Sequence, residues 1–186
     1  GWGAETKIAV VDMSRLVRSH AETPSADALL EKQVDEFQAE QKDMEAEFDK
    51  LKKAFEEARK EATNKALSEA AREEKMQAAE DKLTDVRDYD RKMRETLGSR
   101  QKQLSDQSLR MRKRIVERIK DSVKDHAAKK GFALVLDTAA LSVSGVEIVL
   151  YSADTLDITD DMLKIVAKDK PAAKDAKEAK APETKE

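Results

Sequence analysis

The sequence contains no cysteine and is poor in proline, glycine and aromatic residues. Of its 186 residues, three are proline, five are glycine and 4% are aromatic. Without cysteine the chain can form neither disulfide bonds nor thiolate metal sites. No apolar run approaches the roughly 20 residues that a membrane-spanning helix needs. The sequence also lacks a glycine-rich phosphate-binding loop, so direct use of ATP is not expected.

Charged residues make up 40% of the chain and hydrophobic residues 39%. Typical globular chains have about 25% charged and 45–50% apolar residues. A chain this polar buries too little apolar surface for one large core, so an extended arm or oligomer contacts are expected. The net charge of −3 is not that of an evident nucleic-acid-binding protein.

A long stretch of the chain is free of helix-breaking residues. Between Pro24 and Gly131 it has one glycine, Gly98, and no proline. Apolar residues recur there at alternating spacings of four and three, a pattern that predicts coiled-coil helices. The predicted seam between these helices consists of Leu30, Val34, Phe37, Met44, Phe48, Leu51, Phe55, Leu83, Val86, Met93, Leu97, Leu104 and Met111.

The seam pattern lapses between Thr63 and Lys75, and there we predict the tip of a helical hairpin. Asn64 could end the first helix and Ser68 could cap the second. Asp90 and Arg100 interrupt the second half of the seam, and we predict bending points at these positions.

Charge is distributed unevenly along the predicted hairpin. Residues 22–61 include 13 acidic and 7 basic residues, whereas residues 100–130 include 11 basic and 4 acidic residues. Opposite charges suit two antiparallel helices that partly neutralise each other. The alternative is that these charges only solvate the helix faces.

Three short segments, 7–13, 132–137 and 146–151, have the β-branched and alternating patterns of strands. Three short strands form a poor sheet alone, and pairing with other subunits would cover their edges. The residues predicted to build this shared body are Ile8, Val10, Phe132, Leu134, Leu136, Val146, Ile148 and Leu150.

Helices are predicted beside these strands. A short helix should cover 14–21, and a new helix should start at 23–25 with Pro24 in its first turn. The second long helix should end at Gly131, after two lysines. We expect Thr159 to be the N-cap of a last helix that runs to about Lys168.

Candidate chemical sites are few. His20 and His126 lie near opposite ends of the predicted hairpin without a spaced set of acidic ligands, so we predict no metal site and no cofactor. The basic stretch 110–114 has no interleaved aromatic residue, and we predict no nucleic-acid binding. The carboxylates fit solubility and ion pairing on helix faces, so we predict no enzymatic activity.

Phe37, Phe48 and Phe55 could contact a client protein, but their seam spacing favours packing between helices.

Several segments resemble one known family. They are KIAVVDM at 7–13, Thr23-Pro24, LSEAAREEK at 67–75, RIKDSVKDHAAKKGFALVLD at 118–137 and DITDDMLKIV at 157–166. Together they resemble the Skp (OmpH-like) family of periplasmic chaperones over about residues 7–167. The resemblance implies a homotrimer in which each subunit gives strands to a central β-barrel and projects one helical hairpin. It also implies an ATP-independent holdase for unfolded outer-membrane β-barrel proteins.

The sequence departs from this family in two respects. Well-known members are strongly basic, which suits acidic clients, whereas this chain is mildly acidic. Some members are described as carrying a lipopolysaccharide-binding patch of arm cations, and no matching motif is present here. The first residues, GWGAET, fit either a mature N-terminus left by signal-peptide cleavage or tag remnants.

We therefore predict an α+β fold with a small intersubunit β-barrel body and a long antiparallel coiled-coil hairpin arm in each subunit. The body should comprise 7–24 and 131–168, the arm 25–130, and a disordered tail 169–186. The predicted function is a periplasmic holdase in a Gram-negative-type bacterium, with its signal peptide removed. The alternative is a structural or adaptor coiled-coil protein of the cell envelope. Membrane-surface or lipid contact, the identity of the clients and the role of the tail are left open.

Overall fold

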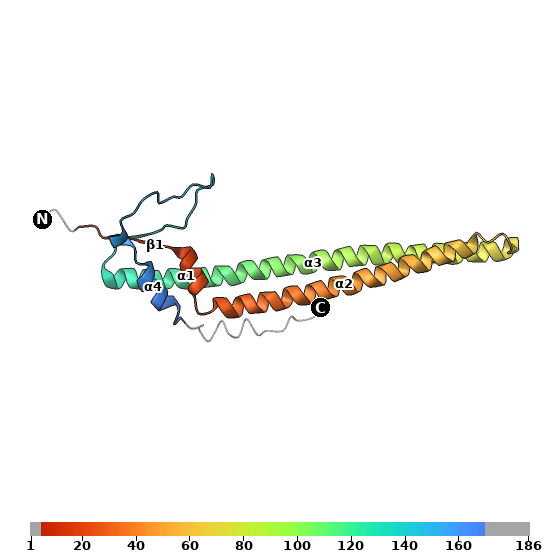
Figure 1. Ribbon diagram of the computed structural model, residues 1–186, viewed down its shortest axis with the longest axis horizontal. Coiled ribbons are helices and arrows are strands. Elements are labelled where there is room, and N and C mark those ends of the chain that lie inside the picture. Colours follow the sequence, from red (N-terminus) through yellow and green to blue (C-terminus); the bar gives the residue numbers. More distant parts are fainter. Residues whose placement is uncertain (1–4, 170–186) are drawn as a thin grey trace. The chain divides into compact units, whose positions relative to one another are not determined.

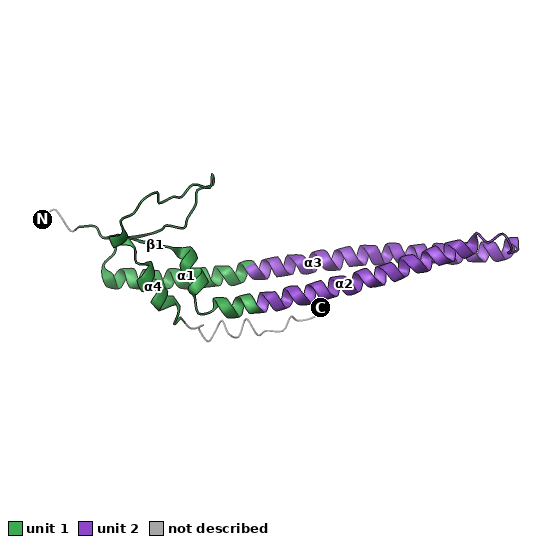
Figure 2. Ribbon diagram, viewed as in Figure 1, with its two compact units in different colours: residues 1–28, 109–186 green, residues 29–108 purple. Residues whose placement is uncertain are grey.

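The computed structural model describes residues 5–169 of the chain (Figure 1). The predicted tail from residue 170 onward and the first four residues lie outside the described residues. The chain divides into two compact units (Figure 2): residues 1–28 with 109–186 form the first, and residues 29–108 form the second. Both long helices pass through the two units.

The first unit combines two short strands with helices. Its elements in chain order are β1 (Ile8–Val11), α1 (Met13–Ser19), the start of α2 (Thr23–Ala62), the end of α3 (Glu69–Lys130), β2 (Leu134–Asp137), the 3₁₀ helix η1 (Asp154–Leu156) and α4 (Thr159–Val166). Strands β1 and β2 pair in parallel, from Ile8 opposite Leu134 to Val11 opposite Asp137. The prediction of long helices beside a small sheet is confirmed, and the described chain is mostly helical.

Local sequence signals explain the ends of these helices. The side chain of Asp12 accepts a hydrogen bond from the Arg15 amide at 3.0 Å and caps α1. Pro24 lies in the first turn of α2, where its missing N–H costs no helical hydrogen bond. Gly131 follows α3 with φ of 75°, a left-handed conformation that favours glycine. These three boundaries are therefore encoded locally.

The core of the first unit lies between one face of the sheet and three helices. Ala9 and Val11 of β1 point into it, and Val135 of β2 packs against it. Their alternation follows from the two-residue period of a strand. Each fully buried Leu, Ile, Met or Val side chain stabilises the fold by about 1.5–3 kcal/mol. The buried core residues are Ala9, Val11, Leu16, Ile115, Ile119, Ile158, Met162 and Val166.

The prediction that Thr159 is the N-cap of the last helix is wrong. Thr159 is the first residue of α4, and its amide donates to the Asp157 carboxylate at 2.8 Å. The Thr159 hydroxyl donates to the same carboxylate and accepts a hydrogen bond from the Asp12 amide at 2.9 Å. The hydroxyl therefore ties α4 to the end of β1, a contact between residues 147 positions apart.

The prediction of a third strand at 146–151 is also wrong. In the described part of the chain this region makes one antiparallel bridge, between Leu141 and Glu147. A turn with Gly145 at φ of 79° precedes it. Strands form where a neighbouring backbone offers a ladder of partners, and this chain offers the segment a single bridge. Within residues 5–169 the sheet has two strands and does not close into a barrel.

The second unit is a hairpin of α2 and α3 joined by residues 63–68. The carboxylate of Glu61 lies 2.8 Å from Nζ of Lys75, and Glu40 lies 3.4 Å from Nε of Arg100. The residue numbers of the two pairs sum to 136 and 140, which is the nearly constant sum expected of antiparallel helices. The Ser68 hydroxyl accepts a hydrogen bond from the Ala71 amide at 3.3 Å and caps α3 as predicted.

Candidate interaction surfaces

The described residues contain no cluster of three or more metal-ligating side chains. His20 and His126, the two histidines considered as metal ligands, have different environments. His20 is buried and hydrogen-bonded to protein groups, whereas His126 is half-buried on α3. No helix in residues 5–169 is long and apolar enough to span a membrane. Two exposed apolar surfaces stand out in this part of the chain.

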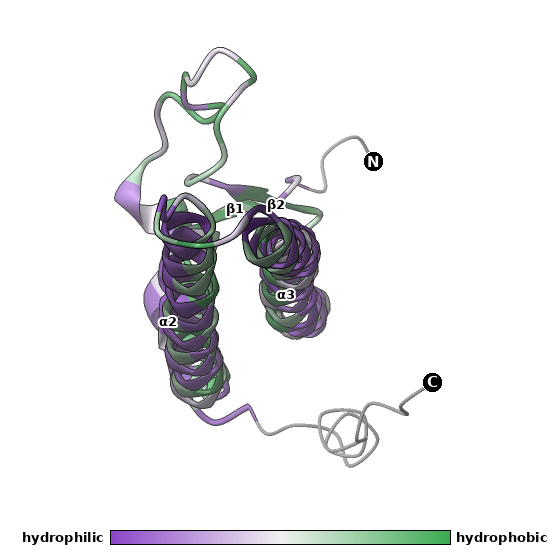
Figure 3. Cartoon of the chain, turned by 90° about the vertical axis from the view of Figure 1, so that its right-hand side faces the viewer, coloured by the Kyte–Doolittle hydropathy of each residue, from purple (hydrophilic) through white to green (hydrophobic). Residues whose placement is uncertain are grey.

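The first surface is the apolar side of the first unit that does not face the core. Of the eight predicted body residues, Val10 is 3% exposed and Phe132 is partly buried against the core. The others are exposed because they lie on the outer face of the sheet or on the chain after it. In Figure 3, β1 and β2 carry the hydrophobic colour. The exposed apolar residues here are Ile8, Leu134, Leu136, Leu141, Val143, Val146, Ile148, Leu150, Tyr151 and Leu156.

Several individual side chains of this surface are mostly exposed to solvent. Leu150 is 80% and Tyr151 87% exposed, and Ile148 is 61% exposed. Contiguous exposed apolar patches usually mark interaction sites in soluble proteins. The segment 141–156, which we call the apolar flap, is therefore a strong candidate for contact with another chain.

An apolar groove of about 720 Å³ lies in the same unit, between α1, the end of α3 and β2. Val116, Val123 and Ala127 recur on one face of α3 and line it. Cationic side chains of α3 also line the groove. They are Arg112, Lys120 and Lys124. Asp137, whose carboxylate accepts hydrogen bonds from the Met13 and Ala139 amides, also lines the groove. The groove thus combines an apolar floor with three cations and one hydrogen-bonded carboxylate.

The second surface is the predicted seam of the hairpin. Most of its side chains are half-buried, but Val34 is 40% exposed. Met111 is 8% exposed and belongs to the first unit. The half-buried seam residues are Leu30, Phe37, Met44, Phe48, Leu51, Phe55, Leu83, Val86, Met93, Leu97 and Leu104. Their helix spacing places them on one stripe of each helix.

Polar groups interrupt this stripe at the two positions singled out from the sequence. Arg100 reaches Glu40 across the hairpin, and Asp90 binds Nε of Arg94 at 3.0 Å within α3. Oε1 of Gln33 is buried without a hydrogen-bond partner among the described residues. Polar groups within a coiled-coil seam lower stability but help to specify its register.

Two exposed ion pairs of the hairpin shift the pKa values of their partners. The Lys75 ammonium, hydrogen-bonded to Glu61, lowers the pKa of that carboxyl, and the pKa of Lys75 rises in turn. Lys52 likewise lowers the pKa of Asp49, to which it is hydrogen-bonded at 2.8 Å. Solvent screens both pairs, so they contribute little to stability.

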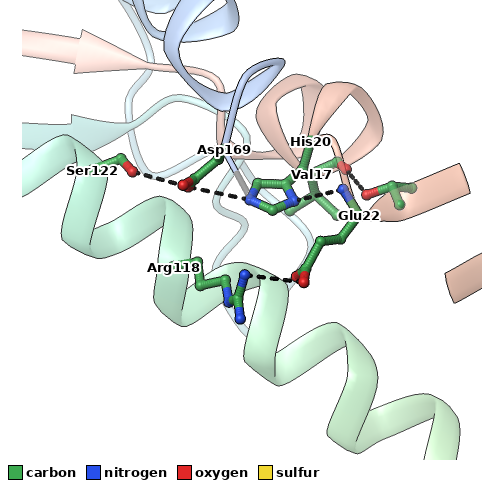
Figure 4. A network of polar contacts seen from close by, with 7 residues as sticks. Val17, His20, Glu22, Arg118, Ser122 and Asp169 are labelled. Carbon is green, nitrogen blue, oxygen red and sulfur yellow. Dashed lines mark hydrogen bonds and ion pairs between the residues drawn. The ribbon is translucent and has the colours of Figure 1, made fainter. Parts of the chain in front are cut away.

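A polar network lies where α1 ends and α2 begins (Figure 4). His20 lies between the Glu22 amide and the Asp169 carboxylate, and the Ser122 hydroxyl donates to that carboxylate at 3.2 Å. Arg118 of α3 binds the Glu22 carboxylate at 3.0 Å. Asp169, which the sequence assigned to the disordered tail, is thus held against the first unit.

Sequence reasoning missed both the network and the groove. The partners of the network are separated by up to 149 positions, and no spacing rule connects them. The groove needs the packing of α1, α3 and β2, so neither helix indicates it alone. The one available signal was the apolar row Val116, Val123 and Ala127 beside the seam.

Comparison with known proteins identifies the family. The family model for outer membrane protein (OmpH-like) matches residues 7–166. A crystal structure of a candidate outer membrane chaperone (OmpH-like) from Caulobacter crescentus superposes with a TM-score of 0.59 and 18% identity, covering 89% of this chain and 86% of that one. At this identity the superposition shows a shared fold. No curated protein sequence matches the chain.

The family model spans most of the chain, including both strands, the two long helices and α4. The resemblance inferred from the terminal segments is therefore confirmed. The chain belongs to the outer membrane protein (OmpH-like) family.

Proposed function

We propose that this protein is an ATP-independent holdase that keeps unfolded outer-membrane β-barrel proteins from aggregating. It would act in the periplasm of a Gram-negative-type bacterium. The family and the chaperone description of the superposed Caulobacter crescentus protein support this class of function. The observation that carries it in this chain is the half-buried apolar stripe of the hairpin.

The hairpin stripe suits binding without a fixed site. A fully buried aliphatic or aromatic side chain gains about 1.5–3 kcal/mol, so a half-buried one leaves roughly 1 kcal/mol for contact with another chain. Phe37, Phe48 and Phe55 are such half-buried groups, and charged side chains alternate with them. Many weak contacts of this kind hold an unfolded chain but impose no defined structure on it.

We further propose that the chain works as a homotrimer assembled through the first unit. Two strands in one chain leave a sheet with open edges, and β-rich segments of neighbouring chains would cover them. The apolar flap exposes side chains that a partner would bury. Its acids Glu147 and Asp154 complement the cations that line the groove, so the flap of one copy would lie in the groove of the next.

The holdase is tested with a denatured outer-membrane β-barrel protein diluted from urea without nucleotide. We expect this chain to suppress light scattering at a near-stoichiometric ratio. A structural or adaptor coiled-coil protein would leave the scattering unchanged, and that result would reject the proposal. Because binding is distributed, Met76→Gln, at a 57% exposed position of the hairpin, should change the required ratio less than about twofold.

The assembly is tested separately by native mass spectrometry. The double variant Ile148→Asp with Leu150→Asp places charge on the flap and should convert the trimer to monomers. Leu109→Asp is the matched control, because Leu109 is 64% exposed on α3 and belongs neither to the flap nor to the groove lining. A wild-type monomer or dimer would refute the trimer without deciding the holdase.

A further inference from the structure

The connection between α1 and α2 is three residues long, and it contains a fully buried histidine. The side chain of His20 has no exposed surface. Its Nδ1 accepts a hydrogen bond from the backbone N–H of Glu22 at 3.1 Å, and its Nε2 lies 3.4 Å from Oδ2 of Asp169. Figure 4 shows the ring between these two groups. His20 therefore links the start of α2 to the segment after α4.

These contacts define the tautomer of the neutral ring. A ring nitrogen that accepts a hydrogen bond carries no proton, so the neutral imidazole holds its proton on Nε2 and donates it to Asp169. Protonation would add a proton to Nδ1, which would then face the Glu22 N–H. Two donors cannot bond to each other. The Glu22 amide would lose its acceptor.

We propose that His20 is a pH-responsive catch at the start of α2. In its neutral form it holds the Glu22 amide, and in its protonated form it releases that amide but keeps its contact with Asp169. The inference concerns the fold of the first unit and does not depend on holdase activity.

The surrounding charges determine which contact is lost. Arg118 of α3 binds the Glu22 carboxylate at 3.0 Å, with side-chain exposures of 14% and 15%, so that carboxylate is already engaged. Asp169 is 30% exposed and receives only the ring and the Ser122 hydroxyl in the network drawn. The Asp169 carboxylate is thus the anion that stabilises an imidazolium here, and the amide is the partner that must leave.

Release of the Glu22 amide would loosen the first turn of α2. The Ala26 amide donates to the Glu22 carbonyl at 3.0 Å, so the backbone orientation of Glu22 supports the first helical turn. The Ala21 amide, bonded to the Val166 carbonyl at 3.0 Å, would still tie the connection to α4. Since α2 runs on into the second unit, acid would increase motion of the chain where the hairpin helix begins.

The test measures exchange protection of single amides by NMR in the full chain from about pH 8 to about pH 5. After correction for the intrinsic exchange rate, protection of the Glu22 amide should fall about tenfold toward low pH. The Phe132 amide, bonded to the Ala127 carbonyl at 3.0 Å, is an internal control and should not change. Ring ¹⁵N shifts should show the proton on Nε2 at high pH.

Two variants isolate the role of the ring. In His20→Asn the side-chain carbonyl can accept from the amide two residues on, as in an Asx turn, but it does not titrate. This variant should keep Glu22 protected throughout the pH range. Asp169→Asn removes the anion beside Nε2, and the loss of protection over the same pH range should be smaller than in the wild type. Constant wild-type protection, an equal loss in His20→Asn, or a neutral ring protonated at Nδ1 would each overturn the proposal.

Discussion

Shortening Ile119 tests whether the first unit depends on one tightly packed core. Ile119 is fully buried in that core, which also contains residues from β1, α1 and α4. Ile119→Val removes one methylene group and should lower the free energy of unfolding by about 1 kcal/mol. Ile119→Ala leaves a cavity that three surrounding elements prevent from collapsing, so we expect a loss of about 3–5 kcal/mol.

The assay is urea denaturation followed by far-ultraviolet circular dichroism at one fixed protein concentration, because the midpoint of an oligomer depends on concentration. With a slope of about 2 kcal/mol per molar urea, the midpoint should fall by roughly 0.5 M for the valine variant and 1.5–2.5 M for the alanine variant. Leu109→Ala, at a 64% exposed position on the same helix, should move the midpoint by less than about 0.25 M. Equal shifts at Ile119 and Leu109 would refute the packing argument.

Three further predictions concern the ends of the long helices. Ser68→Ala removes the acceptor of a first-turn amide of α3 and should lower the free energy of unfolding by about 1 kcal/mol. The measurement is hydrogen exchange of the amides at the tip of the hairpin, which should become about fivefold faster. Unchanged exchange would reject the cap. Gly131→Ala places a side chain at φ of 75°, where its Cβ would have no atom within 4 Å. The left-handed conformation alone should therefore lower the free energy of unfolding, measured by urea denaturation, by about 1–2 kcal/mol. Gly98→Ala, within α3, should instead raise it by about 0.5–1 kcal/mol. The reverse order of these two effects would contradict the backbone argument. Glu61→Gln removes the pair with Lys75. Since the pKa of Glu61 is lowered in the folded state, the pair stabilises above the ordinary glutamate pKa and the contribution is lost as pH falls through the lowered value. The melting-temperature difference between wild type and Glu61→Gln should therefore shrink toward low pH, and a difference that grows would reject this linkage.

Bending of the hairpin at Asp90 and Arg100 remains a prediction. Arg100 is held by Glu40 across the hairpin, whereas Asp90 bonds only within α3 among the contacts of the described residues. We therefore expect amides near Asp90 to exchange faster than those near Arg100. Uniform strong protection from residue 30 to residue 123 would exclude bending at either position.

Much of the helical framework could be predicted because its signals are local. A cap such as Ser68, a proline in a first turn such as Pro24, and a left-handed glycine such as Gly131 act within a few residues of their own position. The regular spacing of apolar residues predicted two long helices and the apolar stripe on each of them. The hairpin loop at 63–68 proved shorter than the predicted tip at 63–75, because the polar positions after Ser68 still form a helical turn.

The errors arose where backbone or side chains depend on distant partners. Residues 146–151 have strand-forming side chains, but a strand needs a neighbouring backbone, and the chain supplies one bridge there. Thr159 has the chemistry of an N-cap, but its hydroxyl donates to the Asp157 carboxylate and accepts a hydrogen bond from the distant Asp12 amide. Local propensity was correct in both cases, and long-range pairing decided the outcome.

The sequence alone determined that the chain is a charged helical hairpin joined to a small strand-containing part. The long stretch without proline and the regular spacing of its apolar residues favour helix locally, without help from distant residues. It also carried the family resemblance, in segments near both ends. The tertiary structure decided which face of each strand is buried, where the groove lies and how His20 meets Asp169. These features depend on residues far apart in sequence, and only packing brings them within hydrogen-bond distance.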